Sequence, residues 1–267
     1  MTTLAVLSLK GGVGKTSVVL GLAEAARGRG GQVLVIDLDP QANATETLLA
    51  QQPDFSSNDV LSDGRRGVAR DAVITSTWGE GLAVIGADPA LEHRNRDQSR
   101  NSGGRLRNAL RGVDSGYDLV LIDCPPSIGE LTRNALIAAN SALIVTEPGY
   151  YALRGAQQAL DSISLIAGAA NPRLRCDGIV VNRFRSVLKE HRHRVEELRE
   201  VYPHLVLDPL LPERSVVANA HGRGSPVQQQ RGKAAREMAS HYERLLDHVV
   251  AAHPPSDADD AAPGPTP

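Results

Sequence analysis

Cysteine is scarce in this chain of 267 residues, and aromatic residues make up only 3% of it. The two cysteines, Cys124 and Cys176, have no CxxC spacing and no neighbours that would complete a metal site. This pattern gives no indication of a zinc site, and two cysteines in a chain of this size are typical of a reducing cytoplasm. We therefore assign the cysteines no chemistry and expect a cytoplasmic protein.

Long apolar runs and a strong net charge are also missing. No apolar run approaches the roughly 20 residues that span a bilayer, and the chain enters a predicted strand too early for a signal peptide. The formal net charge of -2 excludes a globally basic nucleic-acid binder but leaves room for a local basic face. With 41% hydrophobic residues, the chain is long enough for one large α/β domain, which we expect to span residues 1–252.

The most informative stretch is a glycine-rich loop near the N-terminus. An apolar run leads into three closely spaced glycines, and apolar residues at helical spacing follow them. In this order, backbone N–H groups can point into one concavity and the helix points its positive end at an anion. Lys15 is placed to reach the β- and γ-phosphates of a nucleotide, and the Thr16 hydroxyl is placed to ligate Mg²⁺. The alternative is a turn that only joins a strand to a helix. The expected nucleotide-binding residues of the loop are Lys10, Gly11, Gly12, Val13, Gly14, Lys15, Thr16 and Ser17.

Carboxylates follow two further apolar runs that predict strands buried on both faces. Asp37 and Asp39 follow the run at residues 33–36, and Asp123 ends a later run. In open α/β sheets, ligands bind at the C-terminal ends of the strands, so these side chains are expected beside the glycine-rich loop. Asp37 and Asp39 could serve as magnesium ligands, as water-positioning groups or as helix caps, and a cap is also an option for Asn43.

Three ordered motifs resemble those of a known family. Residues 10–16 resemble the signature of the deviant Walker A ATPases, with Leu9 in place of the glycine of an ordinary phosphate loop. Residues 37–43 resemble the second motif of the ParA-type partition ATPases in that family, and residues 123–127 resemble their Asp-x-Pro-Pro-Ser motif. The resemblance covers residues 3–250. It implies a single doubly wound α/β domain, with a mostly parallel sheet and helices on both faces, that binds ATP and Mg²⁺.

The resemblance also implies roles for these residues. In the family, the first lysine of the loop reaches the phosphates of the partner subunit, so Lys10 is expected to act across an ATP-sandwich homodimer. Asp39 matches an aspartate that the family needs for hydrolysis, and we expect it to orient the attacking water. Asp123 is expected to hold magnesium through a bound water, with Asp37 nearby in support. The expected catalytic residues are Lys10, Lys15 and Asp39, and the expected magnesium residues are Thr16, Asp37 and Asp123.

Two later stretches resemble parts of the family that contact the nucleotide base and that form the dimer interface. A predicted strand at residues 178–182 ends in Asn182, where the family places a base-recognising residue. The resemblance therefore implies that Asn182 contacts the edge of adenine, with Pro212 on the opposite wall; a plain turn residue is the alternative for Asn182. Tyr150 and Tyr151 lie where the family has a dimer-interface stretch, and packing at a strand-to-helix corner is the alternative for them.

Basic residues are concentrated in two segments. Residues 183–236 contain 11 basic and 6 acidic residues, and the resulting net charge of about +5 makes this segment the candidate DNA face. Without a helix-turn-helix or zinc spacing, its contacts would go to phosphates and ignore the base sequence. The candidate DNA-binding residues are Arg185, Lys189, Arg192, Arg194, Arg214 and Arg223. The segment from 91 to 111 is predicted as an arginine-rich surface helix, most simply a solvated face, with a partner or DNA role as the alternative.

The C-terminal part combines an amphipathic helix with an acidic tail. Apolar residues at helical spacing between 232 and 252 indicate a helix that packs on the core. A MinD-type membrane anchor is the alternative. The Pro-rich segment 253–267 contains acidic residues that an anionic membrane would repel, so we expect a disordered tail and no membrane binding.

The resemblance as a whole implies a DNA-partitioning ATPase for plasmids or chromosomes. Its ATP-bound homodimer would bind DNA without sequence preference, and slow hydrolysis stimulated by a ParB-type centromere-binding protein would release it. No DNA-binding domain is expected before the ATPase domain, and the protein is expected to associate with the nucleoid. Two alternatives stay open: a MinD-like or cargo-positioning ATPase that acts on a protein partner, and a nucleotide-gated binding module that does not hydrolyse ATP.

Overall fold

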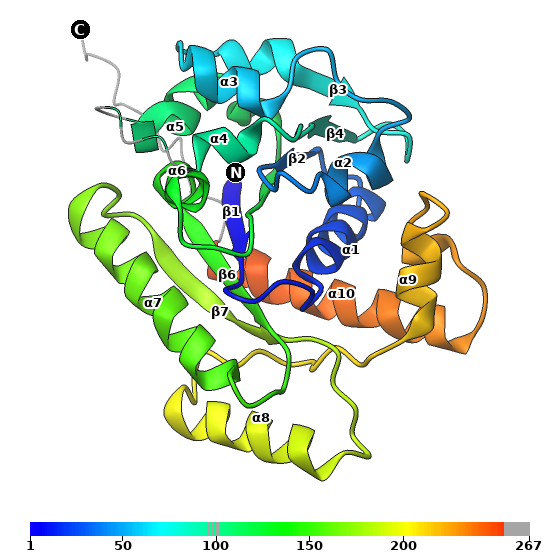
Figure 1. The fold of residues 1–267 in the computed structure, drawn as a ribbon. Coiled ribbons are helices and arrows are strands. Elements are labelled where there is room, and N and C mark those ends of the chain that lie inside the picture. The colour runs from blue at the N-terminus through cyan, green and yellow to red at the C-terminus, as the bar shows by residue number, and fades with distance from the viewer. Residues whose placement is uncertain (96, 98, 100–101, 254–267) are drawn as a thin grey trace, which may run out of the picture.

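A central sheet organises the fold (Figure 1). This computed structural model describes residues 1–95, 97, 99 and 102–253. The strands are β1 (Thr2–Leu7), β2 (Val33–Asp37), β3 (Val73–Thr75), β4 (Leu82–Ile85), β5 (Leu119–Asp123), β6 (Ser141–Thr146) and β7 (Arg175–Val181). Within the described residues these seven strands form one sheet in the order β3-β4-β2-β5-β1-β6-β7. All neighbours are parallel, except that β3 is antiparallel to β4.

Helices cover both faces of the sheet (Figure 1). The helices are α1 (Lys15–Gly28), α2 (Asn43–Leu48), α3 (Ser57–Asp63), α4 (Leu91–Arg94), α5 (Arg105–Leu110), α6 (Glu130–Ala138), α7 (Ala152–Ala169), α8 (Lys189–Val201), α9 (Ser215–His221) and α10 (Lys233–Ala252). Alternate residues of β1 face opposite sides because side chains alternate along a strand. Leu4 and Val6 pack with α1 and α10, whereas Ala5 and Leu7 pack with residues of α3, α5, α6 and α7. The predicted doubly wound α/β fold is confirmed.

The central strands formed where apolar runs predicted them. Every residue of β1, β2, β5 and β6 is buried, as expected for parallel strands that are covered on both faces. The short edge strand β3 was not predicted. It has only three residues, and Ile74 and Thr75 are exposed, so neither length nor an apolar run distinguishes it from a loop.

The structure contradicts two local predictions, and others fall on residues that it does not describe. The predicted helix from 91 to 111 is wrong as one element, because α4 ends at Arg94 and α5 begins only at Arg105. The turn before α5 contains two consecutive glycines, which disfavour helix. Asn43 is not a cap but the first residue of α2, and Ala42 precedes it. Arg96 and Arg100 of the predicted helix, and the predicted tail from residue 254 on, lie outside the described residues.

The last helix packs on the core as predicted. Met238, Tyr242, Leu245, Leu246 and Val249 of α10 are all buried. In the part of the chain that the structure describes, no helix combines the length and the apolar character needed to cross a membrane.

Gly21 of α1 leaves room for Tyr242 of α10, so a larger residue at this position should destabilise the protein. A Cβ atom added at Gly21 would lie 2.4 Å from ring carbons of Tyr242, which is 1% exposed. We expect Gly21→Ala to lower the free energy of unfolding by about 1–3 kcal/mol, the usual range for overpacking a core. Urea denaturation measures this change. The control is Gly28→Ala at the end of the same helix, where no atom lies within 4 Å. Equal stability of the two variants would contradict the prediction.

Candidate nucleotide-binding site

A cavity of about 790 Å³ opens at the C-terminal ends of the central strands. This size lies within the usual range of small-molecule sites, about 300–1,000 Å³. The segments that line it follow β1, β2, β5 and β7, and α9 closes one side. The structure brings all predicted loop residues to its lining, namely Lys10, Gly11, Gly12, Val13, Gly14, Lys15, Thr16 and Ser17.

The loop has a backbone shape that requires glycine. Gly12 and Gly14 have φ angles of 83° and 85°, in the left-handed region that side chains disfavour. A Cβ atom at Gly14 would also lie 2.2 Å from the side-chain nitrogen of Asn182. The helix α1 begins at the next residue, and the N–H groups of its first turn have no partners within the helix. Because Lys15, Thr16 and Ser17 line the cavity, this helix end fits an anion there.

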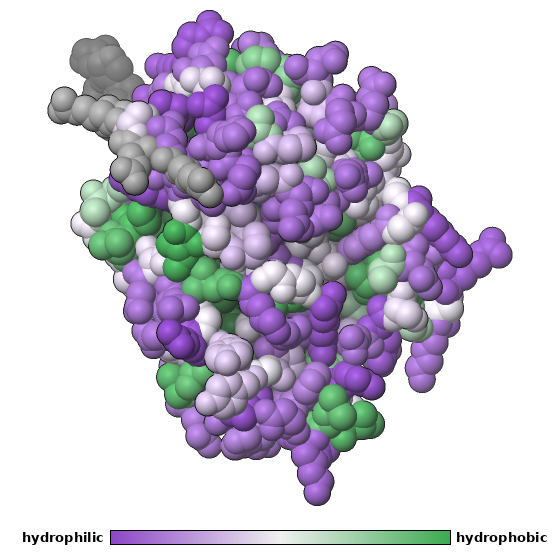
Figure 2. All heavy atoms as spheres, in the orientation of Figure 1, coloured by the Kyte–Doolittle hydropathy of each residue, from purple (hydrophilic) through white to green (hydrophobic). Residues whose placement is uncertain are grey.

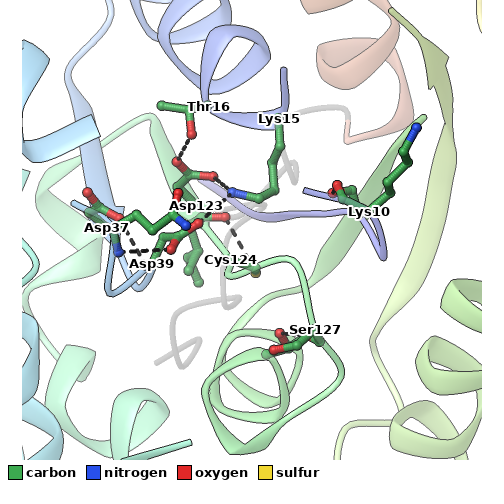
Figure 3. Close-up of polar contacts among 12 residues, drawn as sticks. Lys10, Lys15, Thr16, Asp37, Asp39, Asp123, Cys124 and Ser127 are labelled. Atoms are coloured by element: carbon green, nitrogen blue, oxygen red, sulfur yellow. Dashed lines mark hydrogen bonds and ion pairs between the residues drawn. The ribbon is translucent and has the colours of Figure 1, made fainter. Parts of the chain in front are cut away.

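Lys15 and two carboxylates form a buried charged cluster beside the loop (Figure 3). The Lys15 Nζ atom lies 2.5 Å from Asp123 Oδ1 and 3.6 Å from Asp39 Oδ2. The Thr16 hydroxyl donates to Asp123 Oδ2 at 2.7 Å. The Lys15 side chain is only 6% exposed, and burial by itself lowers its pKa. The attraction of Asp123, with a smaller one from Asp39, nevertheless raises the Lys15 pKa above its ordinary value, so Lys15 is charged.

Asp37 lies deeper than the other two aspartates. Its side chain accepts hydrogen bonds from the Asp39 N–H at 3.0 Å and from the Thr45 N–H and hydroxyl at 2.9 and 2.7 Å. It pairs in register with Asp123 on the neighbouring strand. Burial, and then the charge of Asp123, raise the pKa of Asp37 to about 7. These contacts tie the end of β2 to α2, and the predicted place of Asp37 beside magnesium stays a prediction.

The residues at the cavity fit a magnesium ion that is shared with phosphates. Among the described residues, no group of three or more His, Cys, Asp or Glu side chains is arranged to hold a metal by itself. Mg²⁺ usually keeps several waters and binds through one or two carboxylates together with substrate phosphates. Thr16 and Asp123 supply such oxygens next to the loop. Asp39 also lines the cavity, and burial is the main cause that raises its pKa.

Both cysteines are free thiols, and Cys124, which directly follows β5, is buried and does not line the cavity. Burial raises the pKa of Cys124 and raises that of Cys176 to about 11. Neither thiol therefore ionises readily near neutral pH, as expected for cysteines without a chemical role.

Lys10 does not join the buried cluster within this chain. Its side chain is 62% exposed, and its Nζ atom pairs with Glu147, which follows β6. Figure 3 shows Lys10 extending away from Lys15 and the aspartates. The two lysines of the loop are thus directed to different places, one into the protein and one to its surface.

Asn182 supports the phosphate loop. Its side-chain nitrogen donates to the Val13 carbonyl at 2.8 Å, and the residue is 7% exposed. Its predicted contact with adenine stays a prediction. Pro212 pairs with Phe184 in an isolated β-bridge and lines a separate hollow rather than the cavity itself.

Several residues at the cavity were not predicted as part of the nucleotide site. Arg183 lines it with a φ angle of 55°, an uncommon conformation for a residue with a side chain. His221, Gly222 and Gly224 line it from α9 and the turn that follows. The Trp78 side chain donates to the Gly224 carbonyl at 2.9 Å and so holds that turn. Proximity of Arg183 to Asn182 in the chain was the only available hint.

The predicted DNA-binding residues divide into two groups. Arg185, Lys189, Arg192 and Arg194 lie on α8 or just before it, whereas Arg214 and Arg223 flank α9. Within the described residues, three of the six form ion pairs: Arg194 with Glu190 and Glu197, Arg214 with Glu237, and Arg185 with Glu213. Figure 2 shows hydrophilic side chains over most of this face of the molecule, including the projecting residues beside α9.

The buried cluster predicts a strong dependence of stability on Lys15. Replacing Lys15 by methionine leaves Asp123 and Asp39 without their cation, and breaking a buried ion pair typically costs about 3–5 kcal/mol. We expect Lys15→Met to destabilise the nucleotide-free protein by that order, as measured by urea denaturation. Adding Asp123→Asn should recover part of the loss, because it removes the uncompensated carboxylate. A double variant no more stable than the single variant would contradict this account.

Known proteins resemble this chain in sequence. A family model described as an AAA domain matches residues 1–176. The chromosome partitioning protein ParA of Myxococcus xanthus is 35% identical over 225 residues, which cover 82% of this chain and 77% of that protein. The sporulation initiation inhibitor protein Soj of Bacillus subtilis is 32% identical over 228 residues, which cover 84% of this chain and 89% of Soj.

A solved structure resembles the fold closely. It is cobyrinic acid a,c-diamide synthase from Mycobacterium smegmatis with bound ADP and magnesium. The TM-score is 0.78 at 29% sequence identity, and the match covers 95% of this chain and 97% of that chain. The family model matches well over half of this chain, and both sequence relatives align over most of their lengths. This chain therefore belongs to the ParA/Soj family of partition ATPases.

Proposed function

We propose that residues 1–252 form a DNA-partitioning ATPase domain that binds ATP and Mg²⁺ in the cavity and works as an ATP-sandwich homodimer. The observation that supports this best is the divergence of the two loop lysines. Lys15 is 6% exposed beside Asp123 and Asp39, whereas Lys10 is 62% exposed at the surface of the same loop. A cation at that surface position can complete the site of a second subunit.

The residues of the cavity have different roles in ATP hydrolysis. Lys15 and the N–H groups at the start of α1 would hold the β- and γ-phosphates, and Thr16 and Asp123 would hold magnesium. When bound, magnesium neutralises charge on the phosphate oxygens. Binding draws Lys15 away from Asp123 and Asp39, so both carboxylates become available. Asp39 accepts from the Gln41 N–H at 3.0 Å, which orients its carboxylate, and it positions the attacking water.

The dimer forms around the exposed end of the loop. Tyr150 and Tyr151 are 73% and 64% exposed and pack edge to face, with ring centroids 5.1 Å apart. Arg194 lies 5.3 Å from the Tyr150 ring centroid. Such exposure supports an interface role for the tyrosines rather than packing at a corner. Asn182 holds the loop, and Asn182 and Pro212 remain our candidates for contacts with adenine.

The ATP-bound dimer contacts DNA phosphates through basic residues of α8 and α9. Lys189, Arg192 and Arg223 are the best candidates, since they have no acidic partner among the described residues. A ParB-type protein stimulates hydrolysis, the dimer separates, and the subunits leave the DNA. This cycle places the protein in the cytoplasm, on the nucleoid.

DNA binding tests this proposal directly. We expect the protein to bind a random-sequence duplex with ATP and not with ADP, and the affinity to fall steeply with salt. Asp39→Ala should retain ATP-dependent binding but lose hydrolysis, because the phosphates and DNA are held by other residues. Fluorescence anisotropy measures the binding. Absence of binding in every nucleotide state would favour the alternative, an ATPase that positions a protein cargo.

The ion pair between Lys10 and Glu147 should raise the ATP concentration at which dimers form. Lys10 must leave Glu147 before it can reach a second subunit, so Glu147→Gln should lower the ATP concentration needed for dimers. Because exposed ion pairs contribute about 0.2–1 kcal/mol, the shift should be at most about fivefold. Sedimentation at a series of ATP concentrations measures it. Glu200→Gln, which neutralises an exposed acid on α8, is the control; an unchanged threshold in Glu147→Gln would contradict the prediction.

A further inference from the structure

A second hollow, of about 500 Å³, lies between α3, α5 and α6. It shares no lining residue with the nucleotide cavity. Three arginines, Arg105, Arg107 and Arg133, line it together with the backbone of several glycines. A Cβ atom at Gly103 would lie 3.0 Å from the Arg133 Nε atom, so the glycine leaves room for this guanidinium group.

Backbone carbonyls position two of these arginines. Arg107 donates to the Ala170 carbonyl at 3.2 Å, and Arg105 donates to the Leu61 carbonyl at 3.1 Å. Each guanidinium group has five N–H donors, so these bonds orient the group and leave donors for a ligand. Arg133 is 52% exposed and can reach the same ligand from α6.

The acidic residues near the hollow do not cancel its charge. Asp63, the one acid among the described lining residues, already pairs with Arg65 through three side-chain contacts of 2.7–2.9 Å. Arg105 pairs with Asp97 at 3.1 Å, and Arg133 has a longer contact of 3.5 Å with Glu130. Among the described residues, Arg107 donates to a carbonyl and has no acidic partner. Arg107 and Arg133 are thus the cations most available to an anion.

The positive charge extends beyond the hollow. Residues 63–70 and 105–111 contain six arginines and one aspartate, and a second aspartate, Asp71, follows directly and lies near Arg65. The fold joins these two segments, because the Asn108 side chain donates to the Gly64 carbonyl at 2.7 Å and Gly67 donates its N–H to the Asn108 carbonyl at 3.3 Å. The result is a basic band of residues 63–70 and 105–111 with the hollow beside it. Because the basic band is longer than a single phosphate group, it suits a polymer with many phosphates better than one small anion.

We propose that the hollow is a phosphate-binding site, and that with the basic band it holds the backbone of DNA. The guanidinium group matches phosphate oxygens with two parallel hydrogen bonds, and such contacts ignore the base sequence. This inference rests on the proposed function in taking DNA as the ligand. It adds a second contact surface, on α3, α5 and α6, to the one expected on α8 and α9. Three of the six predicted residues in and beside α8 and α9 have acidic partners, so the uncompensated charge of the hollow adds to what that surface offers DNA.

The test is the double variant Arg107→Ala with Arg133→Ala. With ATP present, it should bind a random-sequence duplex more weakly than the wild type at every salt concentration. The slope of log affinity against log salt should become shallower by about 2, because each lost phosphate contact releases about one counterion fewer. The matched control, Arg29→Ala with Arg244→Ala, removes two charges from the face of α1 and α10 and should retain the wild-type slope. ATP hydrolysis without DNA should be the same in all three proteins.

The outcomes separate this inference from the proposed function. Wild-type slopes in Arg107→Ala with Arg133→Ala would overturn DNA contact at the hollow and leave the proposed function intact. If the wild type binds no DNA, the proposed function fails. A second measurement then shows whether the hollow binds phosphate at all. It is the thermal stabilisation of the protein by inorganic tripolyphosphate while ADP and Mg²⁺ saturate the nucleotide cavity. Stabilisation of the wild type but not of the double variant supports a site for small phosphates, and equal responses overturn the inference.

Discussion

One buried cation facing several buried carboxylates is the constraint on which the site depends. Lys15, Asp39 and Asp123 are each no more than 7% exposed, and Asp37 lies completely buried beside them. Among the described residues, Lys15 is the cation that pairs with Asp39 and Asp123, so one lysine faces two carboxylates. A magnesium ion with a nucleotide brings further positive charge to the carboxylates and offers Lys15 phosphate oxygens in their place. The cluster is therefore suited to exchange partners when nucleotide binds, which links occupancy of the cavity to the positions of Asp39 and Asp123.

The sheet makes this cluster possible. Because β2 and β5 are parallel neighbours in register, Asp37 and Asp123 end side by side, and the loop after β1 reaches them from the next strand. Asn182, at the end of β7, then fixes that loop from the other side through the Val13 carbonyl. Four strands thus contribute to one cavity, while the face that would meet a second subunit presents Lys10. The same architecture leaves α5 and α6 free to form a separate basic surface.

Local patterns were sufficient for the fold and for most of the site. Buried parallel strands are recognisable as apolar runs, and the glycines, Lys15 and the aspartates follow those runs directly. Contacts between distant residues were not predictable in this way. Lys10 and Glu147 are 137 residues apart, and Asn182 and Val13 are 169 residues apart, so only the packed structure brings them together. The break in the predicted arginine-rich helix, by contrast, has a local signal in Gly103 and Gly104, which disfavour a helix although the arginines around them favour one.

In the proposed dimer, each nucleotide site is completed by a lysine of the other subunit. Mixing two inactive variants, Lys10→Ala and Asp39→Ala, tests it most directly through the rate of ATP hydrolysis. In a mixed dimer, the site that retains Asp39 receives Lys10 from the Asp39→Ala subunit and is therefore complete. We expect hydrolysis to return on mixing and to grow with the proportion of mixed dimers. If both variants are inactive alone and the mixture stays inactive, Lys10 acts within its own subunit and does not complete the site of the other.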